Sequence, residues 1–272
     1  MKKRRPIRLV QLQHPKSGRR VAVVERNKLR LLAGVDSIYR LAESALARRR
    51  SLAQAIKKSM SAEMLNYDAV YSGRSAWHLL PAFDHPDEPA RCLVTGTGLT
   101  HQKSVATRQA MHTNPNAPMS DSMKMYLLGV EGGRPGSGKI GAAPEWFYKG
   151  CGTILRAHGE PLDVPAFGLD GGEEAEVAGA YLVDANGEPR RVGLVLTNEF
   201  SDHEFEQINY LYHAHSKLRT CAIGPELVVA ADFHDARGRV RIRRGRKTVW
   251  AKPFATGEKN MSHTVANLEH HH

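Results

Sequence analysis

Residues 171–206 read GGEEAEVAGAYLVDANGEPRRVGLVLTNEFSDHEFE, and this stretch decides which fold we expect. Two apolar runs rich in β-forming residues flank Asn186-Gly187, a dipeptide that tolerates positive φ at both central positions of a type I′ turn. The pattern therefore predicts a β-hairpin centred on this dipeptide.

Three glutamates are expected to meet on one face of this hairpin. If Asn186 and Gly187 are the two central turn residues, the numbers of any two paired residues add up to 373. Glu174 then lies opposite Glu199, and Glu176 lies opposite Thr197. Because side chains alternate between the two faces of a sheet, all three carboxylates project from the same face.

Three clustered carboxylates indicate either a metal site or a solvated strand edge. Like charges at this spacing repel each other unless a cation neutralises them. Oxygen ligands at this density suit Mg²⁺, with Mn²⁺ or Ca²⁺ as alternatives, whereas zinc usually recruits His or Cys. A bulge near Pro189 would shift the pairing by one residue and turn Glu199 to the other face, so the spacing leaves both interpretations open.

The composition is that of a globular protein. The chain has 272 residues, of which 41% are hydrophobic and 25% are charged, enough for one large domain or two smaller ones. No apolar run approaches the roughly 18 residues of a membrane span, and the basic residues 2–5 precede no signal-peptide core. The three cysteines are far apart, which excludes a disulfide framework and a Cys-x-x-Cys metal site. We expect a cytoplasmic protein without a membrane partner.

The formal net charge of +11 raises the question of a nucleic-acid partner. In the most basic segment, Arg239, Arg241 and Arg243 alternate with Val240 and Ile242, as on the outer face of an ordinary strand. The sequence contains no helix-turn-helix, zinc-finger or aromatic RNA-binding motif beside this charge. We therefore expect a small anionic substrate, and not nucleic acid, as the main partner.

Two domains are expected on either side of a segment rich in proline. Residues 7–32 predict paired strands and residues 36–61 predict a helical stripe, so residues 1–85 are expected to form a small N-terminal domain. Three prolines within residues 81–89 disfavour both helix and central strand and mark the boundary. Residues 90–272 are expected to form the second domain.

The second domain carries polar residues of the kinds that active sites use. A loop loosened by glycines contains Thr100, His101 and Ser104, and it leads into a predicted helix around Arg108 and a predicted mobile lid over residues 113–121. Exposed polar loops often have no catalytic role, so the loop alone does not define a site.

Two lysines and a helix start complete the candidate groups. Lys149 stands within a predicted aromatic strand, where a buried ammonium needs a negative partner, and Lys217 precedes another predicted strand. Residues 201–204 resemble a capping box with Ser201 as the cap, at the start of a helix that reaches about His215.

In their order along the chain, these residues resemble the signature of the fumarylacetoacetate hydrolase family. Five matches carry the resemblance: Lys149 at the family's Phe-x-Lys lysine, Glu174-Ala-Glu176 at its Glu-x-Glu, Asn198-Glu199 at its Asn-Asp, Lys217 at the lysine upstream of its Gly-Pro, and Gly224-Pro225 at that Gly-Pro. The resemblance covers roughly residues 90–255. It implies an α+β, β-rich fold, namely a mixed β-roll with a small N-terminal α+β domain. It also implies a homodimer and a Mg²⁺ ion that chelates a 2-oxo acid.

Two departures from the family pattern affect the expected reaction. Ser104 stands about where the family's hydrolases carry a lid histidine, and Glu199 replaces an aspartate ligand with a side chain one methylene longer. Three segments resemble most a bacterial subgroup that acts on 2-keto-3-deoxy sugar acids: residues 96–101, 144–150 and 217–220. That subgroup continues past residue 272, so we expect the catalytic domain to be incomplete at its C-terminal end, or residues 268–272 to be a tag remnant.

The resemblance implies a metal-dependent lyase that dehydrates a 2-keto-3-deoxy sugar acid such as 2-keto-3-deoxy-L-arabinonate. Two alternatives remain: a hydrolase that cleaves a C–C bond of a 2,4-diketo acid, and an inactive metal-binding or nucleic-acid-associated protein. The expected roles are as follows: Glu174, Glu176 and Glu199 bind the metal; Lys149, His101 and Ser104 are catalytic; and Lys149, Lys217 and Thr100 bind substrate.

Overall fold

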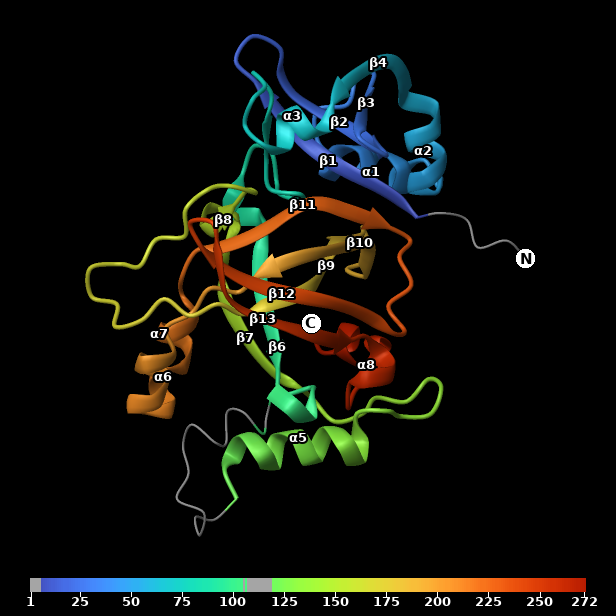
Figure 1. Cartoon of the computed structure of the whole chain (residues 1–272). Coiled ribbons are helices and arrows are strands. Elements are labelled where there is room, and N and C mark those ends of the chain that lie inside the picture. Colours follow the sequence, from blue (N-terminus) through green and yellow to red (C-terminus); the bar gives the residue numbers. More distant parts are fainter. Residues whose placement is uncertain (1–5, 105, 107–118) are drawn as a thin grey trace. The chain divides into compact units, whose positions relative to one another are not determined.

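The computed structural model describes residues 6–104, 106 and 119–272. The predicted helix around Arg108 and residues 113–118 of the predicted lid lie outside these described residues. The described chain is rich in strands, with short helices between them (Figure 1), which confirms the expected α+β, β-rich class.

The chain forms two compact units that do not follow its linear order. The first unit comprises Met1–Val94, Gly150–Phe205 and His215–Ala231, and the second comprises Thr95–Lys149, Glu206–Ala214 and Asp232–His272. The metal ligands expected from the sequence all belong to the first unit.

A nine-stranded sheet dominates the first unit. Its strands are β1 (Ile7–His14), β2 (Gly18–Glu25), β3 (Lys28–Leu32), β4 (Met60–Asn66), β5 (His78–Leu79), β8 (Leu155–Arg156), β9 (Ala175–Val183), β10 (Pro189–Asn198) and β11 (Cys221–Val229). The main order is β4-β3-β2-β1-β11-β10-β9, while β5 pairs with β1 and β8 pairs with β11. Among the strands that the structure describes in this sheet, the short β8 alone runs parallel to its partner.

Helices pack on both faces of the N-terminal part of this sheet. Alternate residues of β1 point to opposite faces, so Leu9 and Val10 belong to two separate hydrophobic clusters. Helices α1 (Ile38–Ala47) and α2 (Leu52–Ser59) contribute to the Leu9 cluster, and α3 (Tyr67–Tyr71) contributes to the Val10 cluster. The sheet is therefore buried on both sides where these helices lie.

The predicted helical stripe over residues 36–61 forms two helices instead of one. After α1, the chain starts α2 with a capping box in which Ser51 and Gln54 satisfy each other's backbone N–H groups. The last residues of the stripe begin β4, which pairs with β3. The apolar periodicity correctly predicted helical structure here, but it did not reveal where α1 ends and α2 begins.

Strand β1 also pairs with β11, so the first unit joins the predicted N-terminal domain to strands of the predicted catalytic domain. The register places Leu9 opposite Leu227 and Ile7 opposite Val229. Whether residues 1–85 and 90–272 are separate folding units remains a prediction, which the expression of residues 90–272 alone would test.

The second unit is assembled from shorter pieces. Its main elements are β6 (Leu93–Gly98), β7 (Glu145–Cys151), α5 (Asp121–Gly132), β12 (Ala236–Arg244), β13 (Lys247–Thr256) and α8 (Val265–His270). The first two residues of β6 and the last two of β7 belong to the first unit. Strand β6 pairs with β7, and β12 pairs with β13. Asn267 of α8 accepts a hydrogen bond from Gly141 N at 2.8 Å and donates one to Ala142 O at 2.8 Å, which attaches α8 to the segment after α5.

The remaining elements are short. Helices α6 (His203–Ile208) and α7 (His213–Lys217) flank a 3₁₀ turn at Tyr210–Tyr212, and further 3₁₀ turns lie at Pro89–Arg91, Gly152–Ile154 and Glu258–Asn260. Strand β12 exposes the side chains of Arg239, Arg241 and Arg243, as the alternation predicted. Among the described residues, no helix has both the length and the apolar character needed to cross a bilayer.

Candidate metal centre

Strands β9 and β10 form the predicted hairpin, but its turn differs from the prediction. Asp184 O accepts a hydrogen bond from Gly187 N at 3.0 Å, and Asp184 N donates to Glu188 O at 2.9 Å. Gly187 has a φ of 82°, whereas Asn186 is not among the residues with positive φ. A type I′ turn needs positive φ at both centres, so the predicted turn type is wrong. Pairs next to the turn consequently add up to 372, as in Pro189 with Val183.

A bulge then restores the predicted register before the chain reaches the glutamates. The pairing shifts between Arg191 and Gly193, so that Thr197 lies opposite Glu176. At the base of the hairpin, Glu199 N donates to Glu174 O at 2.8 Å. The carboxylates therefore stand in the register that the sequence predicted, although two irregularities cancel to produce it.

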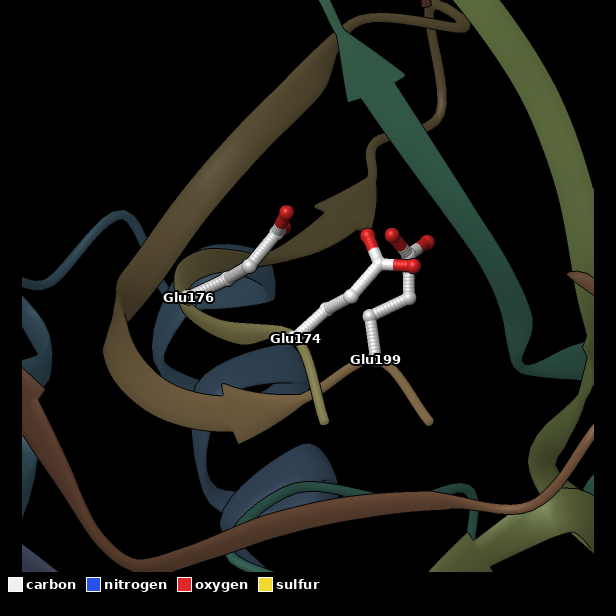
Figure 2. Close-up of side chains that lie close together, drawn as sticks. All are labelled: Glu174, Glu176 and Glu199. Carbon is white, nitrogen blue, oxygen red and sulfur yellow. The ribbon is translucent and has the colours of Figure 1, made fainter. Parts of the chain in front are cut away.

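Glu174, Glu176 and Glu199 converge at the open end of this hairpin (Figure 2). Each offers one carboxylate oxygen, and these oxygens all lie within 4.8 Å of one another. Glu199 is buried, Glu174 is half-buried and Glu176 is exposed. The predicted cluster is thus present, and it is accessible from solvent on the side of Glu176.

Lys217, the last residue of α7, places its ammonium beside two of these carboxylates. Its Nζ donates a hydrogen bond to Glu174 Oε1 at 2.6 Å and lies 3.5 Å from Glu199 Oε2. Burial by itself lowers the pKa of Lys217, but the charges of Glu174 and Glu199 outweigh burial and raise it above the ordinary value. Lys217 is therefore protonated at neutral pH. Its substrate-binding role remains a prediction.

His203 also contacts the cluster, although no motif in the sequence marks it as a site residue. Its Nε2 lies 3.0 Å from Glu174 Oε1, and its Nδ1 lies 3.8 Å from Asp170 Oδ2. The hydrogen bond with Glu174 raises the pKa of His203. Burial raises the pKa of Glu174, but His203 and Lys217 together lower it below its ordinary range. Glu174 is therefore ionised at neutral pH.

The start of α6 fixes where His203 lies. Asp202, and not the predicted Ser201, caps the helix, because Asp202 Oδ1 accepts a hydrogen bond from Phe205 N at 3.0 Å. Its Oδ2 accepts hydrogen bonds from Leu169 N at 2.8 Å and from Arg219 Nη2 at 3.2 Å. Asp202 and Arg219 are both buried, so this ion pair secures the helix start from inside the unit.

The helix expected from Ser201 to about His215 is interrupted. Helix α6 ends at Ile208, a 3₁₀ turn follows, and α7 resumes at His213. Apolar residues recur at helical spacing over this range, yet Ile208 is 60% exposed and Leu211 is 86% exposed. Phe205 packs edge-on against His215, but Ile208 and Leu211 do not share in such burial, so tertiary packing does not support one continuous helix over this range.

The other predicted site residues belong to the second unit. Lys149 is buried on β7, and Thr100 is buried in the loop after β6. His101 contacts Thr100 Oγ1 at 3.0 Å and Thr256 Oγ1 at 3.1 Å, and burial lowers the pKa of its imidazole. Ser104 is exposed. Their catalytic or substrate-binding roles remain predictions.

Comparison with known proteins supports the fold and not a particular activity. No protein-family model matches the sequence, and no curated protein matches it. Among solved structures, the apo form of 2-keto-3-deoxy-D-arabinonate dehydratase superposes with a TM-score of 0.65 and 16% identity, over 97% of this chain and 81% of that one. The same dehydratase complexed with magnesium and 2,5-dioxopentanoate gives a TM-score of 0.65 and 16% identity, over 96% of this chain and 80% of that one.

A third solved structure with a similar fold is that of an isomerase. The 2-hydroxyhepta-2,4-diene-1,7-dioate isomerase from Mycobacterium marinum gives a TM-score of 0.53 and 14% identity, over 96% of this chain and 79% of that one. The chain therefore has the fumarylacetoacetate hydrolase-like fold that the sequence predicted, and its fold resembles that of a 2-keto-3-deoxyarabinonate dehydratase. At these identities the shared fold does not specify the substrate.

Proposed function

We propose that the protein is a metal-dependent dehydratase of a 2-keto-3-deoxy sugar acid. The observation that carries this proposal is the convergence of three carboxylate oxygens within 4.8 Å on one end of the β9–β10 hairpin. The fold is shared with a dehydratase whose structure holds magnesium and 2,5-dioxopentanoate, which adds support for a divalent ion and an oxo acid. The homodimer expected from the sequence is part of the same proposal.

The three glutamates have the chemistry that a hard divalent cation requires. All three supply carboxylate oxygens, the ligands that Mg²⁺ and Ca²⁺ prefer, whereas zinc sites usually include His or Cys. Oxygens bound to one Mg²⁺ lie about 3 to 4 Å apart, and those around Ca²⁺ lie up to about 5 Å apart. Oxygens within 4.8 Å of one another are close enough for one such ion to bridge, so the cluster suits a hard divalent cation without selecting between Mg²⁺ and Ca²⁺.

A divalent ion at these glutamates would polarise the 2-keto oxygen of a bound 2-oxo acid and make its C3 protons more acidic. Dehydration then removes one C3 proton and the C4 hydroxyl as water, and it leaves a C3–C4 double bond. In this proposal Lys217, whose ammonium already lies beside the glutamates, binds the substrate carboxylate. Lys149 remains the proposed base or enolate-binding residue, with His101, Ser104 and Thr100 assisting from the loop after β6.

The test is a panel of 2-keto-3-deoxy acids and 2,4-diketo acids incubated with Mg²⁺, with and without chelator. Dehydration gives a product that retains every carbon atom and has lost one water, whereas hydrolysis gives pyruvate and a smaller acid. Glu176→Gln is expected to lose turnover. Glu63→Gln is the matched control, because Glu63 is an exposed glutamate of the same unit on β4 and is not part of the carboxylate cluster. Pyruvate formation, or full activity in chelator, would contradict the proposal.

A further inference from the structure

His203 lies between a carboxylate of the cluster and a carboxylate outside it. It is the first residue of α6, with Nε2 at 3.0 Å from Glu174 Oε1 and Nδ1 at 3.8 Å from Asp170 Oδ2. The Asp202 cap directly before it fixes the direction in which the ring leaves the helix. The ring is therefore placed by the fold and not only by its contact with Glu174.

Gly172 provides the space that the His203 ring occupies. A Cβ atom added at Gly172 would lie 2.3 Å from both Cε1 and Nδ1 of this ring, a distance that real Cβ atoms essentially never show. The glycine backbone is held in turn, because Gly172 N donates to Ser201 O at 2.8 Å and Ser201 N donates to Gly172 O at 3.0 Å. The backbone bridge between Gly172 and Ser201, together with the start of α6, thus leaves a space that the imidazole of His203 fills.

The two oxygens of Glu174 have different surroundings. Oε1 is engaged twice, by Lys217 Nζ at 2.6 Å and by His203 Nε2 at 3.0 Å. In the part of the chain that the structure describes, no hydrogen bond to Oε2 is found. When neighbouring side chains hold one oxygen of a carboxylate, the other oxygen points in a defined direction. Side chains that hold a metal ligand in this way, without binding the metal themselves, change the affinity for the metal.

We propose that His203 is a positioning residue, which holds Glu174 Oε1 so that Oε2 points to the divalent cation. This inference rests on the proposed function, because it assumes that the three glutamates bind the ion. The proposed role depends on the N–H group that donates to Glu174 Oε1. A substituted side chain with a hydrogen-bond donor at this position should therefore preserve metal affinity, and an apolar side chain of similar length should not.

The experiment measures the binding of Mn²⁺ alone by isothermal titration calorimetry, without substrate. His203→Met removes the donor and is expected to weaken Mn²⁺ binding about tenfold or more. His203→Gln keeps an N–H donor at similar reach and is expected to stay within about threefold of wild type. His158→Met is the control, because His158 stacks on Tyr71 and is not part of the cluster. Gly172→Ala should weaken binding with His203 intact, because the added Cβ displaces the ring.

The outcomes separate this inference from the proposed function. If wild type binds no Mn²⁺, the metal centre itself is wrong. If wild type binds Mn²⁺ and the Met and Gln variants bind equally well, or lose affinity equally, the donor of His203 does not position Glu174 and the inference is overturned. Thermal unfolding in chelator confirms that each variant is folded before its affinity is compared.

Discussion

Replacing Lys217 with Met should destabilise the metal-free protein markedly. The Lys217 side chain is 6% exposed, and its ammonium contacts Glu174 at 2.6 Å and Glu199 at 3.5 Å, with the Glu199 side chain 8% exposed. Removing one partner of a buried ion pair typically costs 3–5 kcal/mol, because the remaining charge is left unpaired. Since Glu174 is only half-buried and keeps His203, we expect a loss near the lower end, about 3 kcal/mol.

A divalent cation should reverse much of this loss. Ligand at about 100 times its Kd stabilises a folded protein by about 2.7 kcal/mol, and the ion would supply the positive charge that the variant lacks. The assay is urea or thermal unfolding in chelator and again in saturating Mg²⁺. Lys28→Met serves as the matched control, because Lys28 is an exposed lysine of the same unit and should change stability little in either condition.

Two results would refute this reasoning. If Lys217→Met is as stable as wild type in chelator, the ammonium does not hold the carboxylates together. If the variant loses stability but Mg²⁺ stabilises it no more than it stabilises the Lys28→Met control, the destabilised glutamates are not the place where the ion binds.

Two further predictions concern stability. Asp202→Asn should cost about 3 kcal/mol of unfolding free energy, because it removes the counter-charge of the buried Arg219. Burial raises the pKa of Asp202, but hydrogen bonds from backbone N–H groups and Arg219 lower it below its ordinary value. The stability that ionised Asp202 contributes is therefore present above about pH 4 and is lost as the pH falls through the lowered pKa. In denaturant titrations, the free energies of unfolding of wild type and Asp202→Asn should converge in acid. A difference in unfolding free energy that stays constant with pH would contradict this. Gly98→Ala should cost on the order of 2 kcal/mol, since the added Cβ would lie 1.8 Å from the carboxylate of the buried Glu145. Gly136→Ala, where a Cβ meets nothing within 4 Å, is its control, and equal melting temperatures would show that Glu145 moves aside without cost.

The sequence predicted the carboxylate cluster because the side-chain period of a strand is two, so the register decides which residues share a face. The prediction reached the correct register with the wrong turn. The local rule for Asn-Gly favours positive φ at both residues, but only Gly187 adopts it, and the bulge between Arg191 and Gly193 compensates. The sequence raised a bulge near Pro189 as a possible one-residue shift, but it did not show that a bulge would offset a change of turn, so agreement at Glu174 and Glu199 depended on two opposing shifts.

His203 could not be found from local pattern, because its contact with Glu174 joins residues 29 positions apart. The nearby capping-box pattern pointed to Ser201, while the fold uses Asp202, whose second oxygen binds Arg219 and so gains a buried ion pair that Ser201 could not make. The interruption between α6 and α7 has a similar origin. Helical periodicity states which residues would share a face, but only tertiary packing determines whether that face is buried.

A crystal structure grown with Mn²⁺ tests the central claim most directly, because manganese is identified by its anomalous scattering. We predict an anomalous peak at bonding distance from one carboxylate oxygen each of Glu174, Glu176 and Glu199, with Oε1 of Glu174 still held by His203. A structure with no peak among these glutamates, and with the Lys217 ammonium still shared between Glu174 and Glu199, would contradict it.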